Sequence, residues 1–587
     1  MSAAAGHGHH DSDLAMSAPA PLPPDHDLAS IAQARDLARR AKLAAAALAA
    51  FSQDRIDRCV DEIAAAALAH AEALAHLAVE ETGYGIAADK VQKNRFAAQR
   101  VHAFIRPMKT VGVVARHPDR RIIEIAEPFG VVAAIVPSTN PTSTAIYKIL
   151  IALKARCPIV LSPHPAAVKS ISRVAEVMDE AARRAGAPAG AVNWMTAVTI
   201  EGTQELMKHR DVAVILATGG LGLVRAAYAS GKPAYGVGPG NAPAFIERTA
   251  EVTKAVRDIV AGKTFDNGLL CSSENSVVVD EPVADRARQA FLQEGAYFLS
   301  QSEVDVLARA LVTPSRLPNP TLVGKSATVI AQACGLVVPS GTRVLIAPLE
   351  GGGRDYPLSI EKLCPVLSWY VVRDWHEGCE RCRQILRYGG MGHTMSIHSQ
   401  NDSVILEFGL KKPAFRIIVN SPTSHGSIGL TTGLDPALTL GCGGYGGNMT
   451  SDNISPRHLL NVKRVAYETT SLAALAETAR PVEPTPERGI AAATLSKRIA
   501  QFLEGRGFEP TAGEPPRRVR AAGSAEPDGP AAEADRSRPP EGLRFVCEED
   551  VRAALAAGRT LYLAERAIVT PAARELGEHH RLFVDLS

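Results

Sequence analysis

From residue 129 the chain alternates continuous apolar runs with longer stretches of helical periodicity. The runs that predict buried strands are 130–136, 158–161, 191–195 and 212–217. The stretches that predict helices are 142–155, 165–185, 201–208, 221–230 and 250–262. Buried strands separated by helices are typical of a parallel, doubly wound sheet with helices on both faces. The sequence therefore predicts an α/β fold.

Three polar or glycine-containing segments follow predicted strands, and in such sheets ligands bind beyond the carboxyl ends of the strands. They are PSTNPT at 137–142, SPHP at 162–165 and TGGLG at 218–222. The last places glycines at a strand-to-helix turn, where a pyrophosphate can approach backbone N–H groups and the helix N-terminus. TGGLG alone is a weak motif, but the three segments in order predict a nucleotide site.

The segments before this sheet predict helices and a hairpin. Residues 27–83 are rich in Ala and Leu and predict two or three helices, and 84–106 continue as helix. Residues 110–127 alternate apolar and polar positions, which predicts a β-hairpin. A long hairpin with polar faces is often used for contact between subunits.

The segments after the sheet predict a second lobe. Residues 281–445 again mix helices and strands, and 446–475 predict a return to the first lobe. We therefore expect a cofactor-binding domain at 27–265, a cysteine domain at 266–445 and a returning segment at 446–478.

One cysteine, Cys271, lies in a small polar turn within KTFDNGLLCSSENSVVVD at 263–280. A turn that feeds a strand can hold a side chain open to a cleft while the backbone stays rigid. The thiol is a candidate nucleophile, because local N–H groups can activate it. The alternative is a small core residue, one of nine cysteines in the chain.

Composition excludes several classes of protein. The 587 residues carry a net charge of +2, which argues against a general nucleic-acid or membrane-surface role. Scattered cysteines do not suggest a secreted disulfide framework, and no apolar run has the length of a membrane span. Residues 1–26 predict a disordered leader, and its GHGHHD has no partner ligands at a fixed spacing, so no metal site is expected.

The composition shifts after residue 478. Residues 479–489 are rich in proline and predict a linker, and 508–542 predict disorder. Between them, 490–504 predicts an amphipathic helix, which suits docking onto a partner or packing back on the enzyme. Its predicted apolar face comprises Ala492, Leu495, Ile499, Phe502 and Leu503. Residues 543–587 predict helix, strand and helix.

Several stretches together resemble the CoA-acylating aldehyde dehydrogenases. They include IVPSTNPTSTAIYKILIALKARCPIVLSPHP (135–165), FDNGLLCSSENSVVV (265–279), GMGHT (390–394) and LTLGCGGYGGN (438–448). That family includes the aldehyde half of bifunctional aldehyde–alcohol dehydrogenases and the propionaldehyde and acetaldehyde dehydrogenases of bacterial microcompartments. The resemblance covers about residues 27–475. It implies a Rossmann-type cofactor domain, an α/β catalytic domain and an oligomerisation hairpin.

The resemblance implies catalytic roles for three residues. Cys271 would attack the aldehyde as thiolate and carry the acyl group as a thioester, which the thiol of CoA then takes. The side-chain amide of Asn140 and the amide of Cys271 would stabilise the oxyanion. An Asx-turn before Pro141 is a second role open to Asn140. His393 would orient the site, help deprotonate a thiol or be a structural histidine.

One departure from the wider superfamily bears on the product. Hydrolytic members carry a glutamate that activates water, whereas residues 235–240 read YGVGPG, without a carboxylate. Water attack on the thioester should then be slow, which favours acyl-CoA over free acid.

The cofactor contacts are also implied by the resemblance. NAD would lie against the three segments at the strand ends, and Glu361 would hold the nicotinamide ribose, the alternative being a surface carboxylate. The segment residues concerned are Pro137, Thr139, Ser162, His164, Thr218, Gly219 and Gly220. CoA is the expected co-substrate. The Cys379–Cys382 pair lacks a second pair and is interpreted as incidental.

The expected activity is oxidation of a short-chain aldehyde, with propionaldehyde favoured, by NAD⁺ and CoA. Acetaldehyde or sulfoacetaldehyde as substrate, hydrolysis to the free acid, and a non-catalytic scaffold are the alternatives. Residues 543–587 resemble terminal extensions of microcompartment proteins, so we expect shell or core proteins to bind the tail. The expected location is the cytoplasm, inside a microcompartment, as a homo-oligomer (dimer or tetramer) that binds neither nucleic acid nor membrane.

Overall fold

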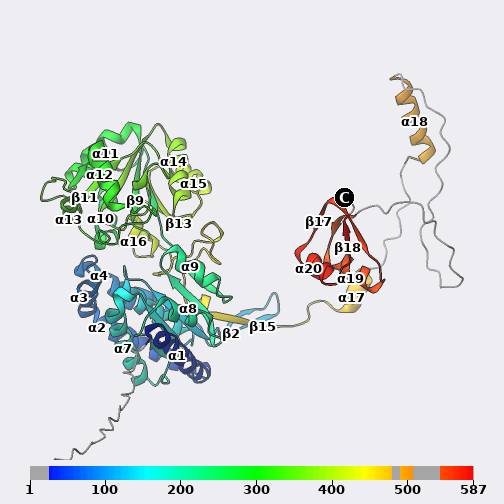
Figure 1. Ribbon diagram of the computed structural model, residues 1–587, viewed down its shortest axis with the longest axis horizontal. Coiled ribbons are helices and arrows are strands. Elements are labelled where there is room, and N and C mark those ends of the chain that lie inside the picture. The colour runs from blue at the N-terminus through cyan, green and yellow to red at the C-terminus, as the bar shows by residue number, and fades with distance from the viewer. Residues whose placement is uncertain (1–24, 479–489, 507–542, 586–587) are drawn as a thin grey trace, which may run out of the picture. The chain divides into compact units, whose positions relative to one another are not determined.

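The computed structural model describes residues 25–478, 490–506 and 543–585, in two units that divide after residue 479 (Figure 1). Most of the predicted leader, the predicted linker at 479–489 and the predicted disorder at 508–542 lie outside the described residues.

A five-stranded parallel sheet forms the first lobe, in the order β5-β4-β3-β6-β7. Its strands are β3 (Val131–Val136), β4 (Ile159–Pro163), β5 (Val192–Trp194), β6 (Val212–Thr218) and β7 (Ala234–Val237). The connecting helices are α6 (Pro141–Lys154), α7 (Val168–Arg184), α8 (Ile200–Lys208) and α9 (Leu221–Tyr228). The predicted α/β fold is confirmed, and β7 is the one strand of this sheet that the sequence did not predict.

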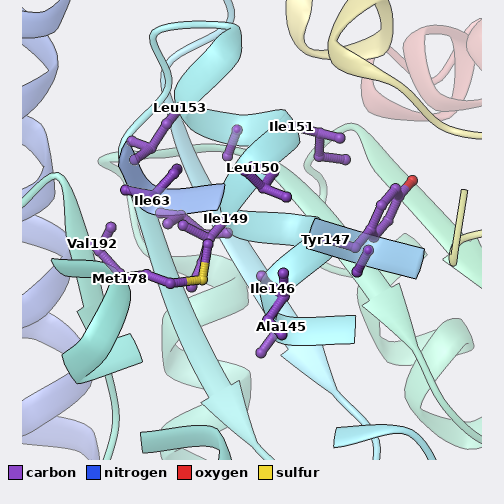
Figure 2. Packing of buried hydrophobic residues seen from close by; sticks show 14 of the residues in the cluster. Ile63, Ala145, Ile146, Tyr147, Ile149, Leu150, Ile151, Leu153, Met178 and Val192 are labelled. Carbon is purple, nitrogen blue, oxygen red and sulfur yellow. The ribbon is translucent and has the colours of Figure 1, made fainter. Parts of the chain in front are cut away.

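Helix α6 is buried along its whole length, including its two lysines, Lys148 and Lys154. Its side chains pack toward Ile63, Met178 and Val192, which come from α2, α7 and β5 (Figure 2). The Tyr147 hydroxyl donates to the carbonyl of Ile454 at 2.5 Å. A helix fixed on all sides gives a rigid base to Asn140, the residue just before its first turn.

Helices precede this sheet, as predicted. They are α1 (His26–Ala49), α2 (Gln53–Ala69), α3 (Ala71–Thr82), α4 (Ala87–Arg95), a π-helical turn (Phe96–Val101) and α5 (His102–Ile105). Among the described residues, no single helix is long and apolar enough to cross a membrane. Helices α2 and α3 meet that criterion only as a pair, across a bend of 61°.

The predicted hairpin is present as β1 (Gly112–His117) and β2 (Ile122–Pro128), which pair antiparallel. Strand β15 (Leu460–Ala466) returns to pair with β2 and completes a three-stranded sheet. The pairing joins a segment after residue 446 to a strand that precedes the first sheet.

The second lobe is a seven-stranded sheet in the order β10-β11-β12-β9-β8-β13-β14. Its strands are β8 (Ala242–Ile246), β9 (Glu274–Asp280), β10 (Ala296–Phe298), β11 (Val344–Pro348), β12 (Val366–Val372), β13 (Gly392–His398) and β14 (Ala414–Val419). Its helices are α10 (Val252–Thr264), α11 (Ala284–Gln293), α12 (Gln301–Leu311), α13 (Ala327–Ala333), α14 (Trp375–Tyr388), α15 (Asp402–Leu410) and α16 (Thr423–Ser427).

The change of sheet comes earlier than the predicted boundary at 265. Strand β8 pairs with β9 and β13, and the buried side of α10 belongs to the same core. The chain therefore leaves the first sheet between β7 and β8. The cause is long-range pairing, which the apolar character of β8 does not reveal.

The last helix of the first unit is α17 (Leu472–Thr478), and the second unit begins with α18 (Ala492–Glu504). Strands β16 (Leu543–Val546), β17 (Leu561–Val569) and β18 (Phe583–Asp585) then form a parallel sheet, with α19 (Glu548–Ala556) and α20 (Pro571–His579) between them. The predicted helix, strand and helix were incomplete, because β16 and β18 have only four and three residues.

Candidate active site

The turn before Cys271 has left-handed backbone at three successive residues: Asp266 (φ 49°), Asn267 (φ 53°) and Gly268 (φ 73°). Asp and Asn tolerate this region better than other residues with a side chain, and Gly adopts it freely. Side chains of the first lobe hold the turn, since Lys90 pairs with the buried Asp266 carboxylate at 2.9 Å. The Asp266 carboxylate also accepts from the amide of Ile86 at 2.7 Å.

Cys271 lies between this turn and β9, and it remains partly exposed. Burial of the sulfur raises the pKa of the thiol to about 12, and the Glu361 and Cys442 side chains add to the rise. Arg416 and the backbone amide of Cys271 act in the opposite direction. The resting protein therefore holds a protonated thiol at neutral pH.

Gly240 packs directly against the backbone of Cys271. A Cβ atom at Gly240 would lie 2.0 Å from the Cys271 carbonyl oxygen and 3.3 Å from Nδ1 of His393. The segment at 235–240 therefore lies beside the candidate nucleophile, and it carries no carboxylate.

Glu361 reaches the same place from the second lobe. Its Oε1 accepts from the amide of Gly240 at 2.9 Å. Burial raises the pKa of the carboxyl to about 8, against the opposing effects of the Gly240 amide, Lys263 and Lys362. Glu361 therefore changes charge close to physiological pH.

Asn140 brings its side-chain amide to the turn that carries Cys271. Its Nδ2 donates to the carbonyl of Leu269 and to Oγ1 of Thr139, each at 3.2 Å. Its Oδ1 accepts from Nζ of Lys93 at 2.5 Å. The proposed oxyanion donor, Asn140, is therefore hydrogen-bonded to the backbone at Leu269, two residues before the proposed nucleophile, Cys271.

His393 is fully buried, and its Nδ1 lies 3.0 Å from Oγ1 of Thr394. Its Nε2 has no hydrogen-bond partner among the residues that the structure describes. Burial, with Arg416 nearby, lowers the pKa of the imidazole to about 3. Such an imidazole is neutral at pH 7 and a weak base, which favours an orienting role over deprotonation of a thiol.

The three predicted cofactor segments meet at one edge of the first sheet. Strand β3 pairs with β4 on one side and with β6 on the other. The segments that follow these strands, with Pro137 and Thr139 after β3, His164 after β4 and Gly219 after β6, therefore start side by side. Because the strands are parallel, their carboxyl ends share this edge.

Two features of this edge suit a pyrophosphate. Oγ1 of Thr218 is buried, and no hydrogen-bond partner for it lies within the described part of the chain. Gly220 directly precedes α9, and a Cβ there would meet nothing within 4 Å. The residues at this turn therefore leave both a polar group and space for a ligand at a helix N-terminus.

Two of the residues predicted to contact the ribose already form hydrogen bonds with other groups of the protein. The hydroxyl of Ser162 is buried and lies 2.8 Å from that of Thr203. His164 is exposed, and its Nδ1 accepts from the amide of Ala166 at 3.1 Å. Ser162 would have to exchange its partner to bind a ribose.

Sequence reasoning missed the buried charges behind the site. Lys93 and Arg416 are 2% and 3% exposed, and Arg416 donates to the backbone carbonyl of Ser451 at 2.9 Å. The signal in the sequence that could have revealed them was a pair of lysines three residues apart, Lys90 and Lys93, in a stretch predicted to pack as a helix.

The two cysteines of the C-x-x-C pair, Cys379 and Cys382, are both buried in the core of the second lobe.

Comparison with known proteins identifies the family. The profile described as "Aldehyde dehydrogenase family" matches residues 25–301. The chain is 37% identical over 433 residues to the succinate-semialdehyde dehydrogenase (acetylating) of Clostridium kluyveri, covering 74% of this chain and 95% of that protein. The chain belongs to the aldehyde dehydrogenase family. The resemblance to its CoA-acylating members, which are oxidoreductases acting on aldehydes, is confirmed.

Other relatives of this aldehyde dehydrogenase agree with the assignment. The bifunctional aldehyde-alcohol dehydrogenase of Escherichia coli is 41% identical, over 74% of this chain and 50% of that protein, so the chain spans about half the length of these curated relatives. An acetylating aldehyde dehydrogenase from Geobacillus thermoglucosidasius superposes with a TM-score of 0.75 at 47% identity, covering 77% of this chain and 99% of that one.

A solved relative also shows a bound co-substrate. A propionaldehyde dehydrogenase from Rhodopseudomonas palustris (26% identity, TM-score 0.66, 74% of this chain and 97% of that one) holds CoA and an acylated cysteine.

Proposed function

We propose that the chain is a CoA-acylating aldehyde dehydrogenase that converts a short-chain aldehyde, CoA and NAD⁺ to acyl-CoA, NADH and a proton. The observation that carries the proposal is the meeting of three groups at one turn: the Cys271 thiol, the Asn140 amide and a 235–240 segment without a carboxylate. The acylated cysteine and CoA in a solved relative support it.

The chemistry begins at the sulfur of Cys271. The thiol releases its proton, the resulting thiolate forms an S–C bond to the aldehyde carbonyl carbon, and the carbonyl oxygen becomes an oxyanion. Nδ2 of Asn140 and the amide of Cys271 would donate to that oxygen. A nicotinamide cofactor, when bound, supplies the hydride acceptor; Thr218, Gly219, Gly220 and Glu361 would hold it.

Loss of hydride from the former carbonyl carbon leaves a thioester on Cys271. The thiol of CoA then attacks the thioester carbonyl, the bond to the Cys271 sulfur breaks, and acyl-CoA leaves. CoA is more acidic than water, so this exchange needs less help from a general base than hydrolysis does.

Replacing Cys271 with alanine tests the assignment. We expect C271A to lose CoA-dependent NADH formation while its circular dichroism spectrum stays unchanged. Cys334→Ala is the matched control, because Cys334 is also partly exposed but lies in a different segment. Turnover by C271A comparable with that of the control would contradict the proposal.

A hydrolytic dehydrogenase is the second candidate, and Glu361 is the observation that favours it. This carboxyl accepts from the amide of Gly240, which packs against the Cys271 backbone. Product analysis with and without CoA separates the two functions. Free acid formed at an equal rate without CoA would favour hydrolysis.

For the substrate we propose propionaldehyde first, with acetaldehyde and sulfoacetaldehyde as alternatives. A related sulfoacetaldehyde dehydrogenase from Acholeplasma sp. (36% identity, 73% of this chain and 89% of that protein) keeps the last of these open. Steady-state kinetics with the three aldehydes, CoA, and either NAD⁺ or NADP⁺ would rank both substrate and cofactor. A higher kcat/KM for another aldehyde would overturn our choice.

For the tail we propose docking to a microcompartment shell or core protein, which would place the enzyme in the compartment lumen. Helix α18 exposes Leu495, Ile499, Phe502 and Leu503, and none of its residues is buried. Residues 495, 499 and 502 follow helical spacing and share one face. We expect deletion of 479–587 to keep activity but to abolish co-sedimentation with shell protein. Unchanged co-sedimentation would refute this role.

We also propose a homo-oligomer, a dimer or a tetramer, built through the sheet of β1, β2 and β15. Strand β15 exposes Val462 and Val465. Replacing Val465 with aspartate should lower the mass measured by light scattering, whereas Arg464→Asp, on the opposite face of the strand, should have less effect. A monomeric mass for the unmodified chain would exclude the oligomer.

A further inference from the structure

Lys93 joins the candidate oxyanion donor to the turn that carries the nucleophile. Its side chain comes from α4 and is 2% exposed, so its ammonium has little access to water. Nζ donates to Oδ1 of Asn140 at 2.5 Å and also to the carboxylate of Asp266. Asp266 belongs to the left-handed turn that ends just before Cys271. One buried cation therefore contacts both parts of the site.

The contact with Oδ1 decides which end of the Asn140 amide faces the nucleophile. An ammonium has only donors, so it can hold the oxygen of the amide and not the nitrogen. With Oδ1 held by Lys93, Nδ2 points to the other side, where it donates to the carbonyl of Leu269 at 3.2 Å. A flipped amide would present an acceptor where negative charge develops.

The charge of Lys93 has a second effect on the same amide. A hydrogen bond from an ammonium is charge-assisted, and in a buried setting it polarises its acceptor. Polarisation of the Asn140 carbonyl makes the Nδ2–H groups stronger donors. The amide is thus both oriented and strengthened for an oxyanion.

We propose that Lys93 is a positioning residue that keeps the Asn140 amide ready to donate to the oxyanion of the thiohemiacetal. This role rests on the proposed function, since it acts on the chemistry at Cys271. Asp266 keeps Lys93 in place through its carboxylate.

Lys90 provides a matched control on the same helix. It is also buried, and it pairs with the same carboxylate oxygen of Asp266 as Lys93 does. Its other contact is the backbone carbonyl of Thr139, at 3.2 Å, rather than the amide of Asn140. Methionine at either position removes one cation from Asp266, but only Lys93→Met frees Oδ1.

The experiment compares kcat and KM for the aldehyde in the full chain with Lys93→Met, Lys90→Met, Asn140→Ala and the Lys93→Met/Asn140→Ala pair. Loss of one oxyanion donor typically lowers kcat about 10²–10³-fold, and we expect that for N140A. We expect K93M to lower kcat about tenfold more than K90M does, with little change in KM. The pair should be no slower than N140A alone, because without the amide Lys93 has nothing to orient.

Thermal unfolding separates this role from simple loss of stability. K93M and K90M each remove one partner of Asp266, so their midpoints should fall together while their kcat values differ. A kcat for K93M no lower than that of K90M would overturn the proposal, and so would a further loss in the pair. Absence of CoA-dependent NADH from the unmodified chain would instead overturn the proposed function, and the role of Lys93 with it.

Discussion

The thiol of Cys271 should react slowly with alkylating agents in the protein without cofactor. Its pKa is raised to about 12, so about one sulfur in 10⁴ is ionised at pH 8. Free cysteine, with a pKa of about 8.5, is roughly a quarter ionised at that pH. The greater nucleophilicity of a more basic thiolate offsets about 1.5 powers of ten. Alkylation of Cys271 by iodoacetamide should therefore be about 10²-fold slower than that of free cysteine.

Replacing Glu361 with glutamine should change this reaction in one range of pH. The Glu361 carboxyl has a pKa of about 8, so below pH 8 it is mostly neutral and glutamine alters little. Above pH 8 its negative charge opposes ionisation of the Cys271 thiol. We therefore expect E361Q to be alkylated faster than the unmodified protein above pH 8, and at a similar rate at pH 7.

The assay follows the Cys271 peptide by mass spectrometry, because the chain has nine cysteines. Glu350→Gln is the control, since Glu350 is an exposed glutamate. Alkylation of Cys271 at the rate of free cysteine at pH 8 would refute the argument from burial. Slower alkylation of E361Q above pH 8 would mean that Glu361 acts as a base toward the thiol.

Two further predictions use matched pairs of variants. Gly240→Ala should lower kcat at least about 10²-fold, because its Cβ would lie 2.0 Å from the Cys271 carbonyl oxygen. Gly238→Ala should be tolerated, since its nearest contact would be a leucine methyl at 3.4 Å; equal kinetics of the two variants would contradict this. Burial lowers the pKa of His398 to about 3, so its contribution to stability is complete above pH 6.5 and is lost as the pH falls toward 3. Between pH 7 and 5 the unfolding free energy, measured by urea unfolding, should fall by about 2 kcal/mol less in His398→Asn than in the unmodified protein. The exposed His376→Asn should show no such difference.

The sequence predicted elements wherever local pattern determines them. The strands that became β3, β4, β5 and β6 are continuous apolar runs, and the sequence predicted that they form a parallel sheet but not their order in it. Strands β16 and β18 were missed because four and three residues are too few to show an alternation of apolar and polar positions. The sheet to which β8 belongs was also missed, because its partners β9 and β13 are chosen by packing over long separations.

The same limit applies to the active site. Cys271, Asn140 and Glu361 were found because the family motifs name them, although their mutual contacts were unknown. Lys93 lies 47 residues from Asn140 and 173 from Asp266, and no local pattern couples residues at such distances. For Ser162 the motif predicted a contact with the cofactor ribose, but in the fold its hydroxyl bonds to that of Thr203.

In the proposed mechanism, the absence of a glutamate in 235–240 would not by itself preserve the acyl group, because Glu361 lies at the same segment. Its Oε1 accepts from the Gly240 amide at 2.9 Å, close to the thioester that Cys271 would carry. A carboxyl with a pKa of about 8 is protonated at pH 7, and a protonated carboxyl cannot take a proton from water. The raised pKa of Glu361 would therefore protect the proposed thioester at neutral pH.

Above pH 8 this protection should fail, since Glu361 then carries the charge of a general base. Enzyme acylated at Cys271 by an acyl thioester, freed of reagents and kept without CoA, should lose its acyl group faster as the pH rises through 8. Intact-mass measurement follows the loss. Hydroxide attacks both proteins equally, so the excess loss in the unmodified protein over E361Q isolates the carboxylate. Equal rates at pH 9 would leave Glu361 without influence on water, and the missing glutamate at 235–240 would then be the sole barrier to hydrolysis.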